Sequence, residues 1–153
     1  MIKKMTMWGF VILTTLSLVA CGNAKETSDK EKTETTKQVT KTVASTDMKI
    51  TKTKLTENGT TGKNLLQLDM NIINNGSTAL AIGAFDFQLK GDDDKTYKPY
   101  PQANNFGDEI QPSKTLNGKI FFEIPTSVKK ATLIYQPNKK SEAEWKLTLP
   151  EKE

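Results

Sequence analysis

Three consecutive aspartates, Asp92, Asp93 and Asp94, form the densest group of potential metal ligands in this sequence. Calcium binds about six to eight oxygens, which carboxylates and carbonyls supply. The run follows Gly91 at a predicted turn, but it lacks the Asp-x-Asp-x-Asp-Gly pattern and distal glutamate of a known calcium loop. We therefore predict a solvated turn, keep calcium as an alternative, and expect no other cofactor.

Four further carboxylates, Asp86, Asp108, Glu109 and Glu123, could act in pairs, as in glycoside hydrolysis. The chain has no histidine and no arginine, and Cys21 is its single cysteine. These absences remove the usual general base near neutral pH, the bidentate anion clamp and any cysteine–histidine nucleophile. We expect a protein that is not an enzyme, with a carboxylate- or calcium-dependent cell-wall hydrolase as the alternative.

Aromatic side chains cluster in and beside a proline-containing stretch, and Tyr97, Tyr100 and Phe106 form a candidate binding loop. Aromatic residues on loops offer large contact areas at low entropic cost. Packing in the core is the competing interpretation for Tyr100 and Phe106. Trp145 stands at strand spacing from Leu147, so we expect it in the core.

The charge pattern argues against nucleic-acid binding. The formal net charge is +4, and the lysines alternate with acidic residues along the chain. Nucleic-acid binding proteins instead gather basic residues into a patch or stripe. We therefore expect a partner of another class.

The first residues follow the order of an export signal: a basic start, an apolar stretch from Met7 to about Val19, and small residues before Cys21. The apolar stretch is shorter than the roughly 18 residues that a membrane-spanning helix needs. Its end, Leu18-Val-Ala-Cys21, resembles the lipobox of bacterial lipoproteins, which implies cleavage between Ala20 and Cys21 and lipidation of the Cys21 thiol. We expect residues 1–20 to be a signal peptide and the mature chain to be anchored on the extracellular face of the cell membrane.

Composition then divides the mature chain into two parts. Residues 21–46 contain many threonines and mixed charges with few large apolar groups, so we predict the lipidated cysteine and a disordered linker. From residue 47 to residue 150 apolar residues alternate with polar ones, and turn residues recur about every ten positions. This pattern predicts an all-β domain, an immunoglobulin-like antiparallel sandwich of about seven strands, with a small closed barrel as the second choice.

The predicted strands differ in clarity. Leu66, Leu68, Met70 and Ile72 alternate with polar residues and should face the core. We expect further strands over 48–55, 79–82, 85–89, 116–124, 131–135 and 143–149, with a brief one at 96–97. In the strand 85–89, Phe85 should face inward with Phe87 and Leu89. Prolines favour an irregular loop from residue 98 to about residue 111.

Several spaced elements resemble the extracellular family called domain of unknown function 4352. They are the strand that ends at Asn74-Asn-Gly76, the segment Phe85-Asp-Phe-Gln-Leu89, the strand Gly118-Lys-Ile-Phe-Phe-Glu-Ile-Pro125, and the final strands around Tyr135 and Trp145. The resemblance covers about residues 48–149. It implies an immunoglobulin-like sandwich, and it implies a lipoprotein or membrane-anchored protein of a Gram-positive bacterium. Asp94 and Ser113 stand where that family commonly has turn glycines. The resemblance implies no catalytic residue.

Three functions follow as hypotheses. The first is a non-catalytic interaction module at the cell surface, which binds an envelope protein, an extracellular protein or a wall polymer through its loops. The second is the hydrolase described above. The third is exclusion of phage or conjugative elements at the surface, which the sequence neither favours nor opposes.

Overall fold

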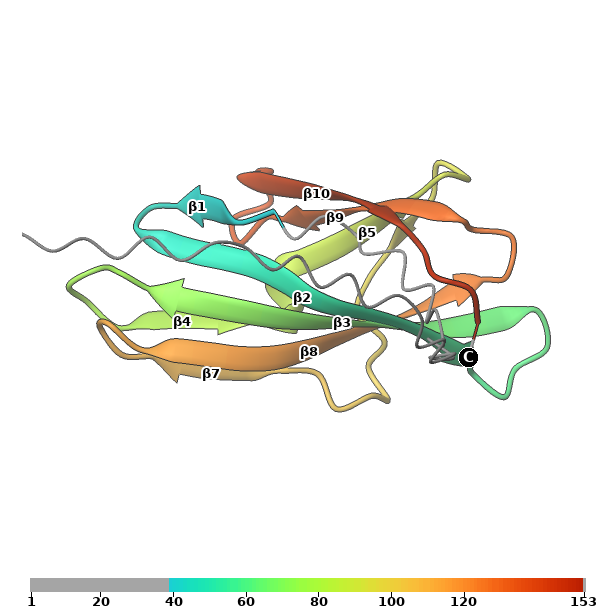
Figure 1. Ribbon diagram of the computed structural model, residues 1–153, viewed down its shortest axis with the longest axis horizontal. Helices are drawn as coiled ribbons and strands as arrows, with labels where there is room; N and C mark the ends of the chain where they lie inside the picture. The colour runs from blue at the N-terminus through green and yellow to red at the C-terminus, as the bar shows by residue number, and fades with distance from the viewer. Residues whose placement is uncertain (1–38, 153) are drawn as a thin grey trace, which may run out of the picture. The chain divides into compact units, whose positions relative to one another are not determined.

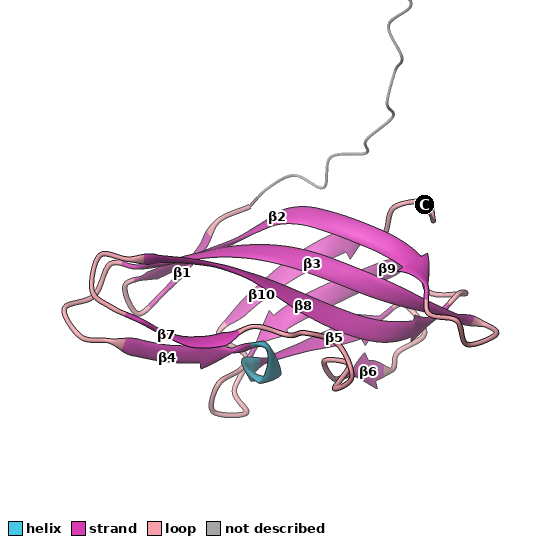
Figure 2. Ribbon diagram, turned by 90° about the horizontal axis from the view of Figure 1, so that it is seen from below, coloured by secondary structure: helices cyan, strands magenta, loops and turns pink. Residues whose placement is uncertain are grey.

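The computed structural model describes residues 39–152, which form a β-sandwich (Figures 1 and 2). One short 3-10 helix, η1 (Ala84–Asp86), lies between two of the strands. The strands in chain order are β1 (Lys41–Val43), β2 (Thr46–Glu57), β3 (Lys63–Asn74), β4 (Leu80–Gly83), β5 (Phe87–Gly91), β6 (Thr96–Tyr97), β7 (Gly107–Ile110), β8 (Thr115–Pro125), β9 (Lys130–Tyr135) and β10 (Ala143–Thr148).

Two four-stranded antiparallel sheets make up the two layers. The first has the order β1-β2-β3-β8, and the second has the order β10-β9-β5-β6. In Figure 1, β5 passes behind β2, so the layers face each other. A separate pair, β4 with β7, completes the structure. The prediction of an immunoglobulin-like antiparallel sandwich is confirmed, and the closed barrel is wrong because the sheets keep free edges.

The core lies between the two layers and follows the alternation in the sequence. Leu66, Leu68, Met70 and Ile72 of β3 are all buried, as predicted. They share the core with apolar residues of β8 and of the second sheet: Ile120, Phe122, Ile124, Phe87, Leu89 and Leu133. Trp145 is also buried, with 4% of its surface exposed. Period-two patterning therefore placed the inner face of the sandwich correctly.

The segment around Phe85 differs from its prediction. Phe85 lies in η1 and is 67% exposed, whereas Phe87 and Leu89 are buried in β5. The chain turns at Gly83, whose backbone N–H donates to Asp86 Oδ2 at 2.8 Å. That local bond forms a helical turn and removes Phe85 from the strand, so the two-residue alternation starts only at Phe87.

The expected loop from residue 98 to 111 is also partly wrong. Its last residues form β7, which pairs with β4 from Ile110–Leu80 to Gly107–Gly83. Three of the four β7 residues are exposed, so the strand has little apolar alternation to reveal it. The remaining segment, residues 98–106, is irregular as predicted.

The predicted linker of residues 21–46 ends too late. Lys41–Val43 form β1, which pairs with the start of β2, and Thr46 is already the first residue of β2. The sandwich therefore begins before residue 47. Residues 1–38, with the predicted signal peptide and most of the linker, lie outside the described part of the chain.

Asp94 and Ser113 both adopt a φ of 60°. This is the left-handed region that glycine enters most easily and aspartate enters at modest cost. The two positions where the resembled family commonly has glycine thus keep a glycine-like backbone.

Candidate functional site

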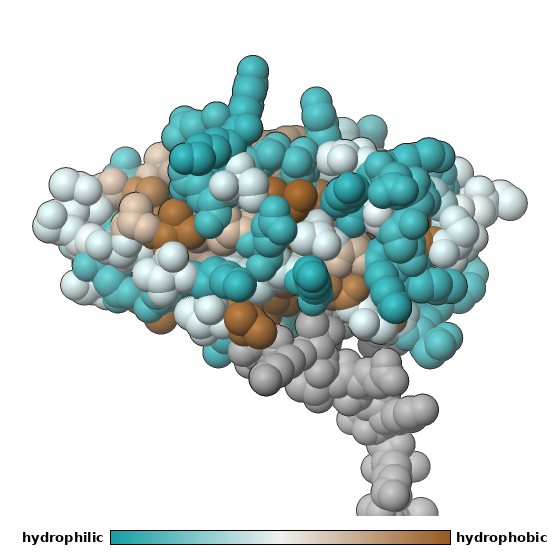
Figure 3. All heavy atoms as spheres, turned by 90° about the horizontal axis from the view of Figure 1, so that it is seen from above, coloured by the Kyte–Doolittle hydropathy of each residue, from teal (hydrophilic) through white to brown (hydrophobic). Residues whose placement is uncertain are grey.

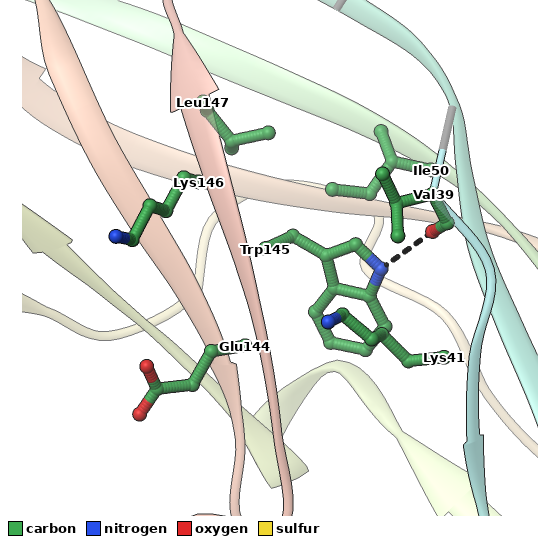
Figure 4. A pocket seen from close by; sticks show the side chains of 7 residues that line it. All are labelled: Val39, Lys41, Ile50, Glu144, Trp145, Lys146 and Leu147. Carbon is green, nitrogen blue, oxygen red and sulfur yellow. Dashed lines mark hydrogen bonds between the residues drawn. The ribbon is translucent and has the colours of Figure 1, made fainter. Parts of the chain in front are cut away.

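A groove lies on the side of the sandwich where the edges of the two sheets meet. β1 is the edge of the first sheet, and β10 is the edge of the second. Figure 3 views the side of the molecule on which β10 lies and shows apolar side chains at the surface among hydrophilic ones. The groove has a volume of about 370 Å³, and Figure 4 shows the residues that line it: Val39, Lys41, Ile50, Glu144, Trp145, Lys146 and Leu147.

Trp145 of β10 is the central side chain of this groove. Its indole Nε1–H donates a hydrogen bond of 2.9 Å to the backbone carbonyl of Val39 (Figure 4). On its inner side the indole ring contacts Phe87, with ring centroids 6.4 Å apart. A buried indole needs a partner for its N–H, and here the segment that leads into β1 supplies it. Trp145 therefore connects the core to the groove.

The other groove residues divide into an apolar wall and a charged border. Ile50 of β2 is 5% exposed and lies on the Trp145 side of β10. Glu144 and Lys146 alternate with Trp145 along β10, and Figure 4 shows their side chains pointing to the opposite side of the strand. Lys41 brings a second ammonium group from β1. The groove therefore suits a peptide segment with an apolar side chain better than it suits a highly charged ligand.

Both edges that border the groove have free backbone groups. β10 pairs with β9 on one side, and within residues 39–152 no strand pairs with its other side. The same holds for β1, which pairs only with β2. Free strand edges can accept an added strand through main-chain hydrogen bonds.

A second hollow, of about 420 Å³, lies on the outer face of the sheet that holds β5, β9 and β10. Register brings Lys90, Thr132 and Lys146 into one row across the three strands. In the next row Lys130 stands opposite Thr148. The Lys90 ammonium is 3.7 Å from Asp94, and both side chains are largely exposed. The positive charge of this face is thus partly neutralised.

The three aspartates of the acidic turn have three different structural partners. The Asp92 carboxylate accepts hydrogen bonds from the backbone N–H groups of Lys129 and Lys130, at 3.0 to 3.3 Å. Asp93 accepts from the backbone N–H of Lys95, and Asp94 forms the ion pair with Lys90. Within residues 39–152 no group of three or more acidic, cysteine or histidine side chains is arranged to hold a metal ion. Each of the three carboxylates thus has a structural partner at or beside the turn.

Tyr97 of the candidate binding loop is tied to this turn. Its hydroxyl donates a 2.5 Å hydrogen bond to Asp93 Oδ2. Burial raises the pKa of Tyr97 to about 12, and the hydrogen bond and negative charge of Asp93 add to the rise. The same bond lowers the pKa of the Asp93 carboxyl. The phenol therefore stays protonated and holds the turn in place.

The segment that contains Tyr100 and Phe106 covers the outer edge of β8. Tyr100 N–H donates to the Phe121 carbonyl at 2.7 Å, and Phe106 N–H donates to the Lys119 carbonyl at 2.9 Å. Between them the side chain of Asn105 accepts from the Phe121 N–H and donates to the Tyr100 carbonyl. The backbone of this segment satisfies the hydrogen-bonding groups of a sheet edge.

Phe106 has the contacts of a packed residue. Its ring meets Phe87 edge-on, with centroids 6.1 Å apart. It also lies directly over Gly118 of β8, where an added Cβ would be 2.5 Å from Phe106 Cγ. The structure thus separates the predicted loop residues, because Tyr97 supports the acidic turn while Tyr100 and Phe106 lie along β8.

The four remaining carboxylates have local partners as well. Asp86 accepts from Gly83 N–H, and Glu123 accepts a 2.5 Å bond from the Asn58 amide. Asp108 accepts from the backbone N–H of Glu109, whose own carboxylate accepts from the Gln111 amide. Asp86, Asp108 and Glu109 thus have partners close by in the sequence, whereas Glu123 of β8 has partners beside and in the neighbouring strand β3, Asn58 and Lys63.

Two predicted site residues, Ala20 and Cys21, lie outside the described residues. Within residues 39–152 the structure has no helix long and apolar enough to cross a membrane.

Sequence reasoning predicted Trp145 as a core residue, which is confirmed, but it missed the groove. Val39 and Lys41 were assigned to the linker, and no sequence signal indicated that they would meet β10.

The two antiparallel sheets place residues 39–152 among the β-sandwich domains. The chain belongs to the family called domain of unknown function (DUF4352), whose model matches residues 28–145. The match starts before β1, which agrees with the earlier start of the domain.

Solved structures share the fold at low identity. The candidate lipoprotein ycdA of Bacillus subtilis superposes with a TM-score of 0.59 at 18% identity, over 72% of this chain and 38% of that one. The yjhA protein of Bacillus subtilis gives 0.53 at 18% identity, over 73% and 96% of the two chains. The secreted protein MPT63 of Mycobacterium tuberculosis gives 0.55 at 14% identity, over 72% and 92%. This chain thus spans well under half of the ycdA structure. No curated protein matches it by sequence.

Proposed function

We propose that this chain is a lipoprotein of the extracellular face of the membrane that binds another envelope or extracellular protein and catalyses no reaction. The groove between β1 and β10 is the observation that carries the proposal. An extended segment of the partner would lie along the free edge of β10 and place an apolar side chain beside Trp145. Strand addition of this kind takes affinity from main-chain bonds and specificity from pockets for alternate side chains.

The chemistry of the groove supports a polypeptide over a polymer of phosphates or sugars. Val39 supplies exposed apolar surface above the nearly buried Ile50, Trp145 and Leu147, and the adjoining strand edges supply backbone donors and acceptors. A non-catalytic role is favoured because the carboxylates of the hydrolase alternative are each engaged by structural hydrogen bonds, Asp86 to the Gly83 backbone and Glu123 to the Asn58 amide. Hydrolysis would need two carboxyl groups directed at one bond.

The location rests on the resemblance of the N-terminus to a lipobox and is in keeping with relatives of the same fold. One of these is described as a candidate lipoprotein and another as a secreted protein. Each buried acyl methylene contributes about 0.8 kcal/mol, so two or three chains anchor a protein stably where one does so reversibly.

Anchoring is tested by Cys21→Ala in the native host. Without the thiol no thioether can form, so we expect the variant to lose incorporation of labelled palmitate and to leave the membrane fraction. Cys21→Ser is the matched control, since it also lacks the sulfur and should behave in the same way. A Cys21→Ala protein that still carries the label would contradict the anchor.

Binding is tested by photocrosslinking in intact cells from a probe at Lys41, inside the groove. A matched probe at Gln102, which is exposed on the 98–106 segment, is the control. We expect one protein to be captured from position 41 and not from position 102. That protein, once purified, should change the emission of Trp145 in the full chain with Trp8→Phe, where Trp145 is the single tryptophan. Equal capture at both positions, or unchanged emission, would refute the groove as the binding site.

A further inference from the structure

β1 is held by few contacts for a strand of a sandwich. It has three residues, and its pairing with β2 runs only from Lys41–Met48 to Val43–Thr46. None of its residues is buried: Lys41 and Val43 are half-buried, and Thr42 is exposed. By comparison, β2 and β3 pair over nearly their whole length of twelve residues each. β1 is therefore a weakly attached edge strand.

The turn that joins β1 to β2 has an unfavourable sequence for its geometry. Ala44 and Ser45 are its two central residues, with φ angles of 44° and 66°. A two-residue hairpin turn with positive φ at both positions favours Asn-Gly, because a Cβ crowds the backbone in the left-handed region. The closed hairpin thus strains the connection between Val43 and Thr46.

The contacts of β1 do not require that it belong to the same copy of the chain. The Val39 carbonyl accepts the Trp145 Nε1–H, and the Thr42 hydroxyl donates to the Asp47 carboxylate at the start of β2. Val43 packs against the core. An identical strand from a second copy would make the same three contacts.

We propose that two copies of this chain exchange β1. Residues 44–45 open into an extended segment. Residues 41–43 of each copy then pair with β2 of the other copy, and the Val39 carbonyl accepts the Trp145 hydrogen bond of that copy. The exchange keeps every contact of β1 and relieves the positive φ of Ala44 and Ser45 in both chains, at the cost of the hydrogen bond from Asn75 N–H to the Ser45 carbonyl. Short strained hinges of this kind favour swapping. The partner is a second copy of this chain, because β2 and Trp145 already form the binding site for β1. The inference does not depend on what the groove binds.

The first test changes the hinge in the full chain and measures the dimerisation constant by sedimentation equilibrium. Ala44→Asn combined with Ser45→Gly suits the closed turn and should weaken dimerisation at least about tenfold, since two hinges per dimer lose their strain. Ala44→Pro cannot adopt a positive φ and should strengthen dimerisation. Lys139→Gly is the control: it relieves a φ of 60° in the turn between β9 and β10, so it should raise the melting temperature without changing dimerisation.

The second test identifies the exchanged strand directly. Thr42 and Asp47 are opposed across β1 and β2. In a Cys21→Ser background, full chains with Thr42→Cys are mixed with full chains with Asp47→Cys and oxidised. Exchange predicts a disulfide-linked dimer, which the Ala44→Asn, Ser45→Gly hinge should suppress. The inference is overturned if the mixture gives no such dimer while a chain carrying both cysteines closes its disulfide internally.

Discussion

Gly118 offers a direct test of whether Phe106 packs or binds. An Ala at this position would place its Cβ 2.5 Å from Phe106 Cγ and 2.7 Å from Phe106 Cβ. Rotation of the ring cannot remove the second clash, because Phe106 Cβ is fixed by the backbone. The segment must move, which stretches the bonds from Phe106 N–H to Lys119 and from Ala84 N–H to Phe106. Gly118→Ala should therefore destabilise the sandwich.

The magnitude follows from the contacts. Overpacking costs about 1–3 kcal/mol, and loss of the edge-on contact with Phe87 costs about 0.5–1.5 kcal/mol. Replacing a strand glycine by alanine returns about 0.5–1 kcal/mol of backbone entropy. We expect a net loss of about 2 kcal/mol in the free energy of unfolding, measured by urea denaturation. For a domain of this size the melting temperature should fall by about 4 °C per kcal/mol.

Phe106→Ala provides the control in a double-mutant cycle. With the ring and its contacts gone, the added methyl of Gly118→Ala meets open space, so the second substitution should be neutral or slightly stabilising. The expected coupling energy between the two positions is about 2 kcal/mol. An equal cost of Gly118→Ala in both backgrounds would refute the contact and return Phe106 to the candidate ligand residues.

Two further predictions concern polar contacts. Asn74→Ala should lower the free energy of unfolding by about 2–4 kcal/mol, because the buried amide donates to the carbonyls of Thr78 and Ile110 and its oxygen accepts from Gly76 N–H. The same change at Asn71, which bonds only one exposed amide, should cost under about 1 kcal/mol, and equal costs would contradict this reading of Asn74. The pKa of Tyr97 is about 12 in the folded chain, against an ordinary value of about 10, so its neutral form contributes stability below pH 10 that is lost between about pH 10 and 12. Asp93→Asn should lower the pKa of Tyr97 in a tyrosinate absorbance titration, and an unchanged titration would contradict the role of their hydrogen bond.

The sequence predicted the fold where strands are long and one face is buried. β2, β3 and β8 have eleven or twelve residues each, and their alternation identified the core correctly. β1 and β7 escaped prediction because they are short and mostly polar, so pairing with a neighbour defines them. Phe85 was placed in a strand because alternation cannot detect a local bond such as the one between Gly83 and Asp86.

The candidate site was less predictable than the fold. The groove joins Val39 and Trp145, which are 106 residues apart, and only the closure of the sandwich brings them together. Composition identified the acidic turn but not its function, because Asp92 takes its partners from another turn. The lipidation of Cys21 stays a prediction, since that residue lies outside the described part of the chain.

The 98–106 segment, which contains Asn105, affects how two molecules can pair when the protein is concentrated. Without this cover, β8 would present an edge of eleven residues that could pair with a strand of another molecule. The 98–106 segment occupies the Lys119 and Phe121 part of that edge. At high local concentration this cover keeps that part of the β8 edge from pairing with a strand of another molecule.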